Sequence, residues 1–259
     1  MLRQTFCHIQ GIGKETERAL WAQGCADWQT FLDHPGEFKC GTSGQDHTRK
    51  MVEQSVEWLA NGIHQPFQKA LGQQEAWRAW PEFRDRCLYL DIETDGGNTG
   101  SAVTIIGLYD GQQFTGLVKD RDLESFRDLI SHASMIVTFF GSGFDVPMLH
   151  KRFKGLLIDQ IHLDLCFALK RLGYKGGLKK IEQQLGISRG DELTGLNGLD
   201  AIRLWRDYSS LGKVQALDQL IAYNREDVVN LESLAGVAYD GLKKQVYAGL
   251  PELSPTPAR

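Results

Sequence analysis

The sequence has few cysteines, and none of them form a closely spaced pair. Cys7, Cys25, Cys40, Cys87 and Cys166 are scattered along 259 residues without a C-x-x-C motif. Structural zinc sites, iron–sulfur clusters and redox dithiols all need neighbouring cysteines, so the sequence gives no support to these classes. Scattered cysteines in odd number are typical of a cytosolic protein with reduced thiols.

Long apolar runs and an excess of positive charge are also missing. No stretch approaches the about 18 continuous apolar residues of a membrane span, and the N-terminus lacks the pattern of a secretory signal. We therefore expect a cytoplasmic protein without a membrane partner. The 29 Lys and Arg against 33 Asp and Glu argue against a protein that coats nucleic acid by bulk charge, although local basic patches remain compatible. A hydrophobic content of 42% is that of an ordinary globular chain.

Residues 1–84 have helical spacing and no convincing strand. Helices are predicted at residues 14–21 and 48–59, with a glycine-rich loop at 35–44 between them. Five of the six tryptophans lie at positions 21, 28, 58, 77 and 80. We expect these rings to pack in a core instead of stacking on bases. This part of the chain is predicted to be a small helical region.

Strands alternate with helices from residue 87 onward, which is typical of a layered α/β domain. The predicted order is strands at 87–93, 102–109 and 113–119, a helix at 122–132, a strand at 135–140, a helix at 146–153, a strand at 158–163, and helices to about residue 244. Asp110 and Gly111 form a strong hairpin signal. This order resembles the ribonuclease H-like arrangement, a mixed five-stranded sheet flanked by helices whose first three strands are antiparallel. We assign residues 85–245 to this domain and 246–259 to a disordered tail.

Two acidic residues, Asp91 and Glu93, lie near the end of the first predicted strand. Residues two apart on a strand point to the same face, so these carboxylates are expected to converge. Like charges in an otherwise apolar strand repel each other unless a cation neutralises them. A divalent metal would do so, although a strand end that has simply reached solvent would carry the same residues.

A third acid, Asp145, follows a strand that breaks at glycines and precedes Pro147 in the first turn of a helix. The residue could act as a helix N-cap, because Pro147 is tolerated there. It could also face the acids at the strand end. Both roles are compatible with the sequence.

Tyr223 and Asp227 lie four residues apart in a helical segment near the C-terminus. This spacing places a phenol and a carboxylate on the same helix face. The intervening Arg225 and Glu226 are assigned to the solvated surface.

These three segments together resemble the motifs of the DnaQ-like DEDD 3′→5′ exonuclease superfamily, tyrosine subtype. The motifs are Asp91-x-Glu93, the segment 143–149 around Asp145, and Tyr223-x-x-x-Asp227. Similar triplets occur in the proofreading domains of family B DNA polymerases and, more closely, in a group of predicted bacterial ribonuclease H-like exonucleases. Supporting features are the segment 162–165, the helix start at 177–182 and the segment 195–208. The resemblance covers about residues 86–240.

The resemblance implies a two-metal hydrolysis of phosphodiester bonds with Mg²⁺ or Mn²⁺. Asp91 would bridge both ions, Glu93 and Asp227 would hold the ion beside the attacking water, and Asp145 would support the other. Tyr223 would orient the water, because a phenol with a pKa of about 10 is mostly protonated at neutral pH. The substrate would be a single-stranded 3′ end of DNA or RNA.

Substrate contacts are expected from Thr94 and Phe144 beside the acids, and from Lys151 and Arg152 after the second motif. Such basic residues are most often a solvated helix face, but beside an acidic cleft they could track phosphates. Relatives commonly have Asn just before the glycine of the second motif, where this chain has Phe140, and this puts the grip on substrate near Asp145 in doubt.

Gly11 and Gly13 resemble the hairpin of helix–hairpin–helix modules. Glycines in that hairpin allow a phosphate to approach a helix N-terminus closely. A purely structural turn fits this short motif equally well.

The leading hypothesis is thus a metal-dependent 3′→5′ exonuclease with an N-terminal region that helps to position the substrate. The alternative is a catalytically silent nucleic-acid-binding or scaffold protein of the same fold, which the departure at Phe140 keeps open. A haloacid-dehalogenase-type phosphatase is excluded, because its motif needs Asp at the position of Glu93.

Overall fold

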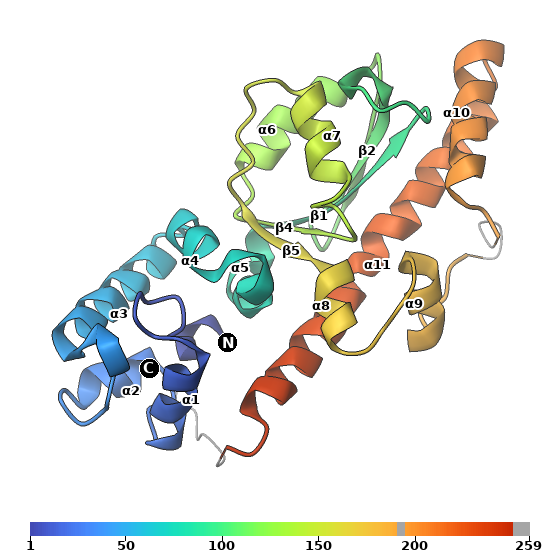
Figure 1. Ribbon diagram of the computed structural model, residues 1–259. Helices are drawn as coiled ribbons and strands as arrows, with labels where there is room; N and C mark the ends of the chain where they lie inside the picture. The colour runs from blue at the N-terminus through green and yellow to red at the C-terminus, as the bar shows by residue number, and fades with distance from the viewer. Residues whose placement is uncertain (191–194, 251–259) are drawn as a thin grey trace.

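The computed structural model describes residues 1–190 and 195–250 (Figure 1). Its sheet consists of β1 (Cys87–Thr94), β2 (Val103–Tyr109), β3 (Phe114–Val118), β4 (Met135–Thr138) and β5 (Ile161–Asp164), in the order β3-β2-β1-β4-β5. The β1–β2 and β2–β3 pairs are antiparallel, and the β1–β4 and β4–β5 pairs are parallel. The predicted fold class, a mixed five-stranded sheet with three antiparallel strands first, is confirmed.

Helices cover both faces of the sheet (Figure 1). They are α6 (Phe126–Ser131), α7 (Asp145–Arg152), α8 (Leu165–Arg171), α9 (Leu178–Leu185), α10 (Gly198–Leu211) and α11 (Val214–Tyr247). The helices α6 and α7 pack on one face, and α11 crosses the other face in contact with β1, β2, β3 and β4. No helix within the described residues is long and apolar enough to cross a membrane.

The strand β1 contributes side chains to both faces of the sheet. Leu90 and Ile92 belong to the core cluster that packs against α6 and α7, whereas Tyr89 belongs to the cluster that includes residues of α8 and α11. Because side chains alternate along a strand, Asp91 and Glu93 lie on the same face as Tyr89. This alternation directs both carboxylates toward α11.

The N-terminal region is helical, as expected. It contains α1 (Lys14–Ala22), α2 (Trp28–Asp33), α3 (Gln45–Ala60), α4 (Gln65–Glu75) and α5 (Trp80–Phe83). Its core is continuous with that of the sheet, because Trp21 and Trp77 share one cluster of buried residues with Tyr89 and Leu231. Four of the five tryptophans are buried and Trp58 packs against the same core cluster, which confirms their role in the core.

A buried ion cluster fixes α1 against the rest of this region. The Arg78 side chain is 1% exposed, and its Nη1 lies 2.9 Å from Glu17 Oε2 while its Nε lies 2.6 Å from Glu75 Oε2. Glu17 also accepts hydrogen bonds from the backbone N–H groups of Phe6, at 2.7 Å, and Cys7, at 3.0 Å. Such a cluster is tolerated in a protein interior because each charge has a partner of opposite sign.

Among the predicted boundaries that differ from the structure, three have a clear physical reason. The strand predicted to end at residue 140 ends at Thr138, because Phe140 adopts a positive φ of 63° that cannot continue a strand. The strand predicted from residue 158 begins at Ile161, where its pairing with Met135 of β4 starts. The predicted tail begins too early, since α11 continues to Tyr247 and Leu250 packs against the core. Residues 251–259 of that tail lie outside the described residues.

Candidate active site

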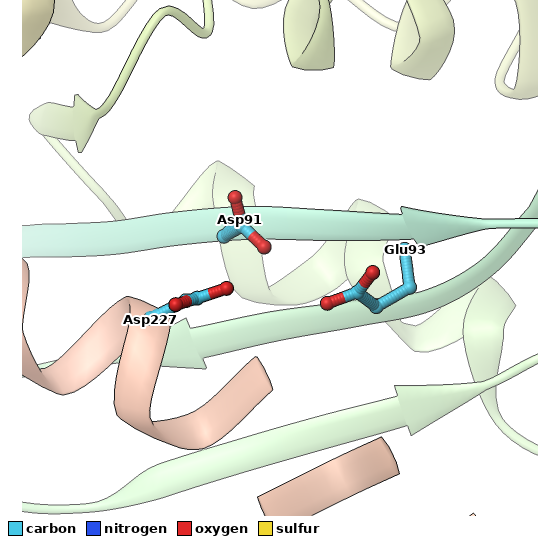
Figure 2. A group of neighbouring side chains, drawn as sticks. All are labelled: Asp91, Glu93 and Asp227. Atoms are coloured by element: carbon cyan, nitrogen blue, oxygen red, sulfur yellow. The ribbon is translucent and has the colours of Figure 1, made fainter. Parts of the chain in front are cut away.

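Three carboxylates meet where β1 passes α11. Figure 2 shows Asp91 and Glu93 projecting from β1 and Asp227 reaching toward them from the helix. One oxygen of each carboxylate lies within 4.8 Å of the others. Glu93 and Asp227 are buried, and Asp91 is half-buried. The predicted convergence of these three acids is therefore present in the structure.

Asp145 lies beside this group, outside the three acids whose oxygens come within 4.8 Å of one another, and its charge acts on Asp91. Its support of a second ion stays a prediction. Its Oδ1 accepts a hydrogen bond of 3.1 Å from the backbone N–H of Ile92, the residue between Asp91 and Glu93. The parallel pairing of β1 with β4 ends at Tyr89, so this edge of β1 is open and Asp145 satisfies it. Asp145 is the first residue of α7 and not its N-cap, a position that Phe144 occupies.

The electrostatics of the group favour a cation. Burial, together with the charges of Asp145, Glu93 and Asp227, raises the pKa of Asp91 well above its ordinary value. Burial and the charge of Asp227 raise the pKa of Glu93 to about 8, and burial raises the pKa of Asp145 to about 7. Each of these groups would ionise more readily beside a positive charge. A donor set made only of carboxylate oxygens suits Mg²⁺ or Mn²⁺, so the residues fit the expected ions.

Asn224 holds the two carboxylates of β1, and the sequence analysis missed it. Its side-chain amide donates to Asp91 Oδ2 at 3.0 Å and to Glu93 Oε1 at 3.5 Å. The Asn224 side chain fits because the residue facing Asp91 across the β1–β2 pair is Gly107. A Cβ atom at position 107 would overlap the Asn224 amide. The only sequence signal was an asparagine within the third motif, one residue after Tyr223.

Arg189 is the second residue that the sequence analysis missed. Its guanidinium forms ion pairs with Asp227 and with Glu182, whose Oε2 lies 2.6 Å from Arg189 Nε. Glu182 is 1% exposed and also accepts a hydrogen bond of 3.0 Å from Asn230. Although burial opposes it, these contacts raise the pKa of Arg189. A permanent cation of the chain therefore lies against one of the three carboxylates.

The family of the chain follows from a comparison with protein-family models. The model of the RNase H superfamily matches residues 88–239, which is more than half of the chain. The chain belongs to the RNase H superfamily. The match includes most of β1 and of α11, and it contains Asp91, Glu93, Asp145 and Asp227. No curated protein and no solved structure gave a significant match.

Tyr223 lies one helical turn before Asp227 on α11 of this RNase H superfamily chain and is buried. Burial and the charge of Asp227 raise its pKa, which keeps the phenol protonated at neutral pH, as expected. The Lys179 ammonium lies 4.3 Å from the centre of the Tyr223 ring. Burial lowers the pKa of Lys179. Tyr223 thus has the protonation state that its predicted role needs, and the role itself stays a prediction.

Thr94 and Phe144 flank the acids, as their motif positions require. Thr94 is the last residue of β1, at an irregularity in the pairing with β2, and its hydroxyl accepts a hydrogen bond of 3.4 Å from Gly96. Phe144 directly precedes Asp145 and is exposed. Their contact with substrate stays a prediction.

Lys151 and Arg152 have partners within the RNase H-like domain. Lys151 Nζ donates to the backbone carbonyl of Asn98 at 2.8 Å. Arg152 Nη2 lies 2.6 Å from Glu124 Oε1. Neither contact involves the acidic group, and the contact of Lys151 and Arg152 with substrate stays a prediction.

The two glycines of the turn, Gly11 and Gly13, differ in how closely they are packed. Gly11 has a φ of 87°, and a Cβ atom there would come within 3.0 Å of the Ser43 backbone. Gly13 is the N-cap of α1 and has no atom within 4 Å of its Cβ position. Gly11 therefore has a structural reason to be glycine, whereas the surroundings of Gly13 are open. Contact with a phosphate stays a prediction.

Proposed function

We propose that this RNase H superfamily protein is a metal-dependent 3′→5′ exonuclease that acts on single-stranded ends of DNA or RNA. The observation that carries the proposal is the gathering of Asp91, Glu93 and Asp227 within 4.8 Å. Nuclease chemistry is what the superfamily match suggests, and an oxygen-only site supports Mg²⁺ or Mn²⁺ as the cofactor. The direction of digestion rests on the resemblance of the three motifs to the tyrosine subtype.

The residues have distinct tasks in this proposal. Asp91, Glu93 and Asp227 would hold two divalent ions, which supply activation of a water molecule and neutralisation of the charge on the phosphate. Asp145, whose Oδ1 accepts a hydrogen bond from the Ile92 N–H, would support the second ion. Asn224 donates to both carboxylates and so holds those of Asp91 and Glu93 in place relative to each other.

Tyr223 would orient the attacking water. A protonated phenol donates a hydrogen bond, and its oxygen accepts one, so the side chain can position a water molecule without removing its proton. Because this is an orienting task, the loss of Tyr223 should reduce the rate less than the loss of Asp91. The Tyr223→Phe variant, which keeps the ring beside Lys179, isolates the contribution of the hydroxyl.

A cleavage assay tests the proposal. Single-stranded DNA and RNA, labelled at either end, are incubated with the purified protein in Mg²⁺, Mn²⁺ or EDTA. A 5′-labelled strand should shorten as a ladder, and a 3′-labelled strand should release its label first. EDTA should abolish both reactions.

The matched variants are Asp91→Asn and Glu226→Gln. Asp91→Asn removes one charge from the carboxylate group and should abolish cleavage, whereas Glu226 is next to Asp227 in sequence but outside that group, so Glu226→Gln should cleave normally. Equal cleavage by wild type and Asp91→Asn would overturn the proposal.

A nucleic-acid-binding protein without catalysis is the second candidate. The observation that favours it is Arg189, a cation of the chain that already pairs with Asp227. This candidate predicts that the wild type binds single strands and leaves them intact in every metal tested. A single metal that supports cleavage by the wild type, but not by Asp91→Asn, excludes it.

A further inference from the structure

Three phenylalanines are exposed around the second motif. Phe140, Phe144 and Phe167 are 50%, 42% and 45% exposed. Phe140 and Phe167 come from different elements, the turn after β4 and the helix α8, yet their ring centres lie 6.4 Å apart. Large aromatic side chains are usually buried, so a pair of adjacent exposed rings indicates a surface that receives another molecule.

The ring of Phe140 is held in this position by a strained backbone. Phe140 has a φ of 63°, a conformation that non-glycine residues rarely adopt. Asp164, which is buried, fixes it by accepting the Phe140 N–H at 2.8 Å. The ring covers Gly143, where a Cβ atom would come within 2.7 Å of it. Strain of this kind persists only where the surrounding structure enforces it, and it concentrates at functional positions.

Phe167 also lines a groove between α8 and the N-terminal region. The groove has a volume of about 570 Å³, and its lining includes Lys14, Gln73, Gln74, Phe167, Lys170 and Arg171. Lys14 is the first residue of α1 and directly follows the turn of Gly11 and Gly13. The groove therefore joins the aromatic pair beside the second motif to the helix start that resembles a phosphate-binding hairpin.

Positive charge is in excess along this groove. Lys14 Nζ lies 2.6 Å and Arg171 Nη2 lies 3.6 Å from the same oxygen of Glu75, whose other oxygen pairs with Arg78. Three cations thus share one buried carboxylate, although Arg78 also pairs with Glu17. Lys170 is exposed, and the described residues include no carboxylate that pairs with it. Three cations therefore line the groove, Lys14, Lys170 and Arg171, against the single carboxylate of Glu75 that two of them share.

We infer that this groove binds the single strand a few nucleotides before the end that enters the active site. Bases would stack on Phe140 and Phe167, and phosphates would lie along Lys170 and Lys14. Exposed aromatic rings beside cations are the combination that single-stranded nucleic acids need. Phe140 links the groove to the active site, because its ring lies 6.4 Å from that of the lining residue Phe167 and it precedes Asp145 by five residues, which span at most about 18 Å. The inference rests on the proposed function for the position of the strand end.

Binding without cleavage tests the inference. The affinity of a fluorescent oligothymidylate of about 12 nucleotides, a length within the usual range for single-strand sites, is measured by anisotropy in EDTA. A second probe of the same length has abasic nucleotides near its 3′ end. The wild type should bind the probe with bases about tenfold more tightly, which corresponds to stacking of one or two bases.

Two variants separate stacking from charge. Phe167→Ala should weaken binding of the probe with bases about fivefold to tenfold and leave the affinity for the abasic probe unchanged. Phe167→Trp, which keeps an aromatic ring, should bind like the wild type. Lys170→Gln should weaken both probes and reduce the slope of log affinity against log salt by about 0.7. The control Lys50→Gln removes an exposed lysine of α3, outside the groove, and should match the wild type.

The outcomes are distinguishable from those of the cleavage assay. If Phe167→Ala and Lys170→Gln both have unchanged affinity and normal unfolding temperatures, the groove does not bind the single strand, even if the protein is an exonuclease. Loss of affinity in these variants supports the groove even if the wild type cleaves nothing. If Phe167→Ala loses affinity equally for the probe with bases and for the abasic probe, the stacking role of the aromatic pair is overturned.

Discussion

Two buried clusters of charge differ in how their carboxylates are neutralised. In the N-terminal region, Arg78 pairs with Glu17 and Glu75, and Lys14 adds a further cation. Burial alone would raise the pKa of Glu75, but Arg78 and Lys14 lower it below the ordinary value. Between β1 and α11, Arg189 is the cation that pairs with the acids, and the pKa values of Asp91, Glu93 and Asp227 are raised.

The difference distinguishes a structural cluster from a functional one. In the N-terminal cluster, both buried carboxylates, Glu17 and Glu75, are neutralised by cations of the chain, so neither carboxylate needs a ligand of positive charge. The cluster at β1 contains more negative charge than the chain neutralises, and a ligand of positive charge would stabilise it. Clustered carboxylates with raised pKa values, here on the central strand β1 and on α11, are thus better evidence for a metal site than the acidic residues alone.

Among the substitutions, removal of Arg78 should have the largest effect on stability. Arg78→Met leaves Glu17 and Glu75 buried without their main partner, which should lower the free energy of unfolding by about 3–5 kcal/mol. Urea denaturation measures this loss. The control Arg84→Gln breaks an exposed ion pair with Glu232 and should cost less than about 1 kcal/mol. Equal effects of the two variants would show that the N-terminal cluster is not a structural unit.

The cluster at β1 should make the metal-free protein less stable as the pH rises. Glu93 has a pKa of about 8 in the folded protein, against 4.5 as its ordinary value. The folded state therefore holds a proton that the unfolded state has lost, and stability present below about pH 4.5 is lost as the pH rises toward 8. Burial of Asp145, whose pKa is about 7, acts in the same direction. For Glu93 alone, this difference in pKa corresponds to a loss on the order of 5 kcal/mol across the window.

Thermal unfolding in EDTA between pH 5 and 9 measures this loss. Glu93→Gln, which cannot ionise, should flatten the profile, and Mn²⁺ should restore stability at high pH. A profile that Glu93→Gln leaves unchanged would contradict the assignment of the repulsion to this cluster.

Gly107→Ala should disturb the cluster through Asn224. A methyl group at this position would overlap the Asn224 amide and approach Val228 to 2.9 Å. We expect a loss of about 1–3 kcal/mol in unfolding free energy, typical of overpacking, and a reduced rate of any cleavage. Gly198→Ala, at an open position in α10, should cause no loss. If the Gly107→Ala protein were as stable and as active as the wild type, Asn224 would not be needed to hold the carboxylates of Asp91 and Glu93.

Arg189→Gln should have the smallest effect of these variants, and the direction of the change in Mn²⁺ affinity is what distinguishes the possible roles of Arg189. The substitution removes the cation that pairs with Asp227, so Mn²⁺ should bind about threefold to tenfold more tightly at low salt. Arg225→Gln, an exposed site on α11, serves as the control. Weaker Mn²⁺ binding in Arg189→Gln would show that Arg189 holds Asp227 in place for the metal instead of competing with it.

The sequence predicted what depends on local spacing. The alternation in β1 placed Asp91 and Glu93 on one face, the helical spacing placed Tyr223 above Asp227, and the turn at Asp110 and Gly111 joined two strands. Each of these follows from residues that are close in the chain.

The missed features depend on contacts between distant segments. Arg189 meets Asp227 only because the chain after α9 folds back on α11, and Gly107 matters only because Asn224 needs its space. Phe140 ends β4 early because Asp164, from another strand, holds its backbone. No local pattern distinguishes such residues from ordinary surface charges or strand positions.

Calorimetric titration of metal-free protein with Mn²⁺ tests the central claim most directly. In two buffers of different ionisation enthalpy, the wild type should bind Mn²⁺ and release protons, because carboxylates with raised pKa values ionise when the ion binds. Asp91→Asn should bind much more weakly. Equal affinity and equal proton release in the two proteins would show that these carboxylates are not a metal site.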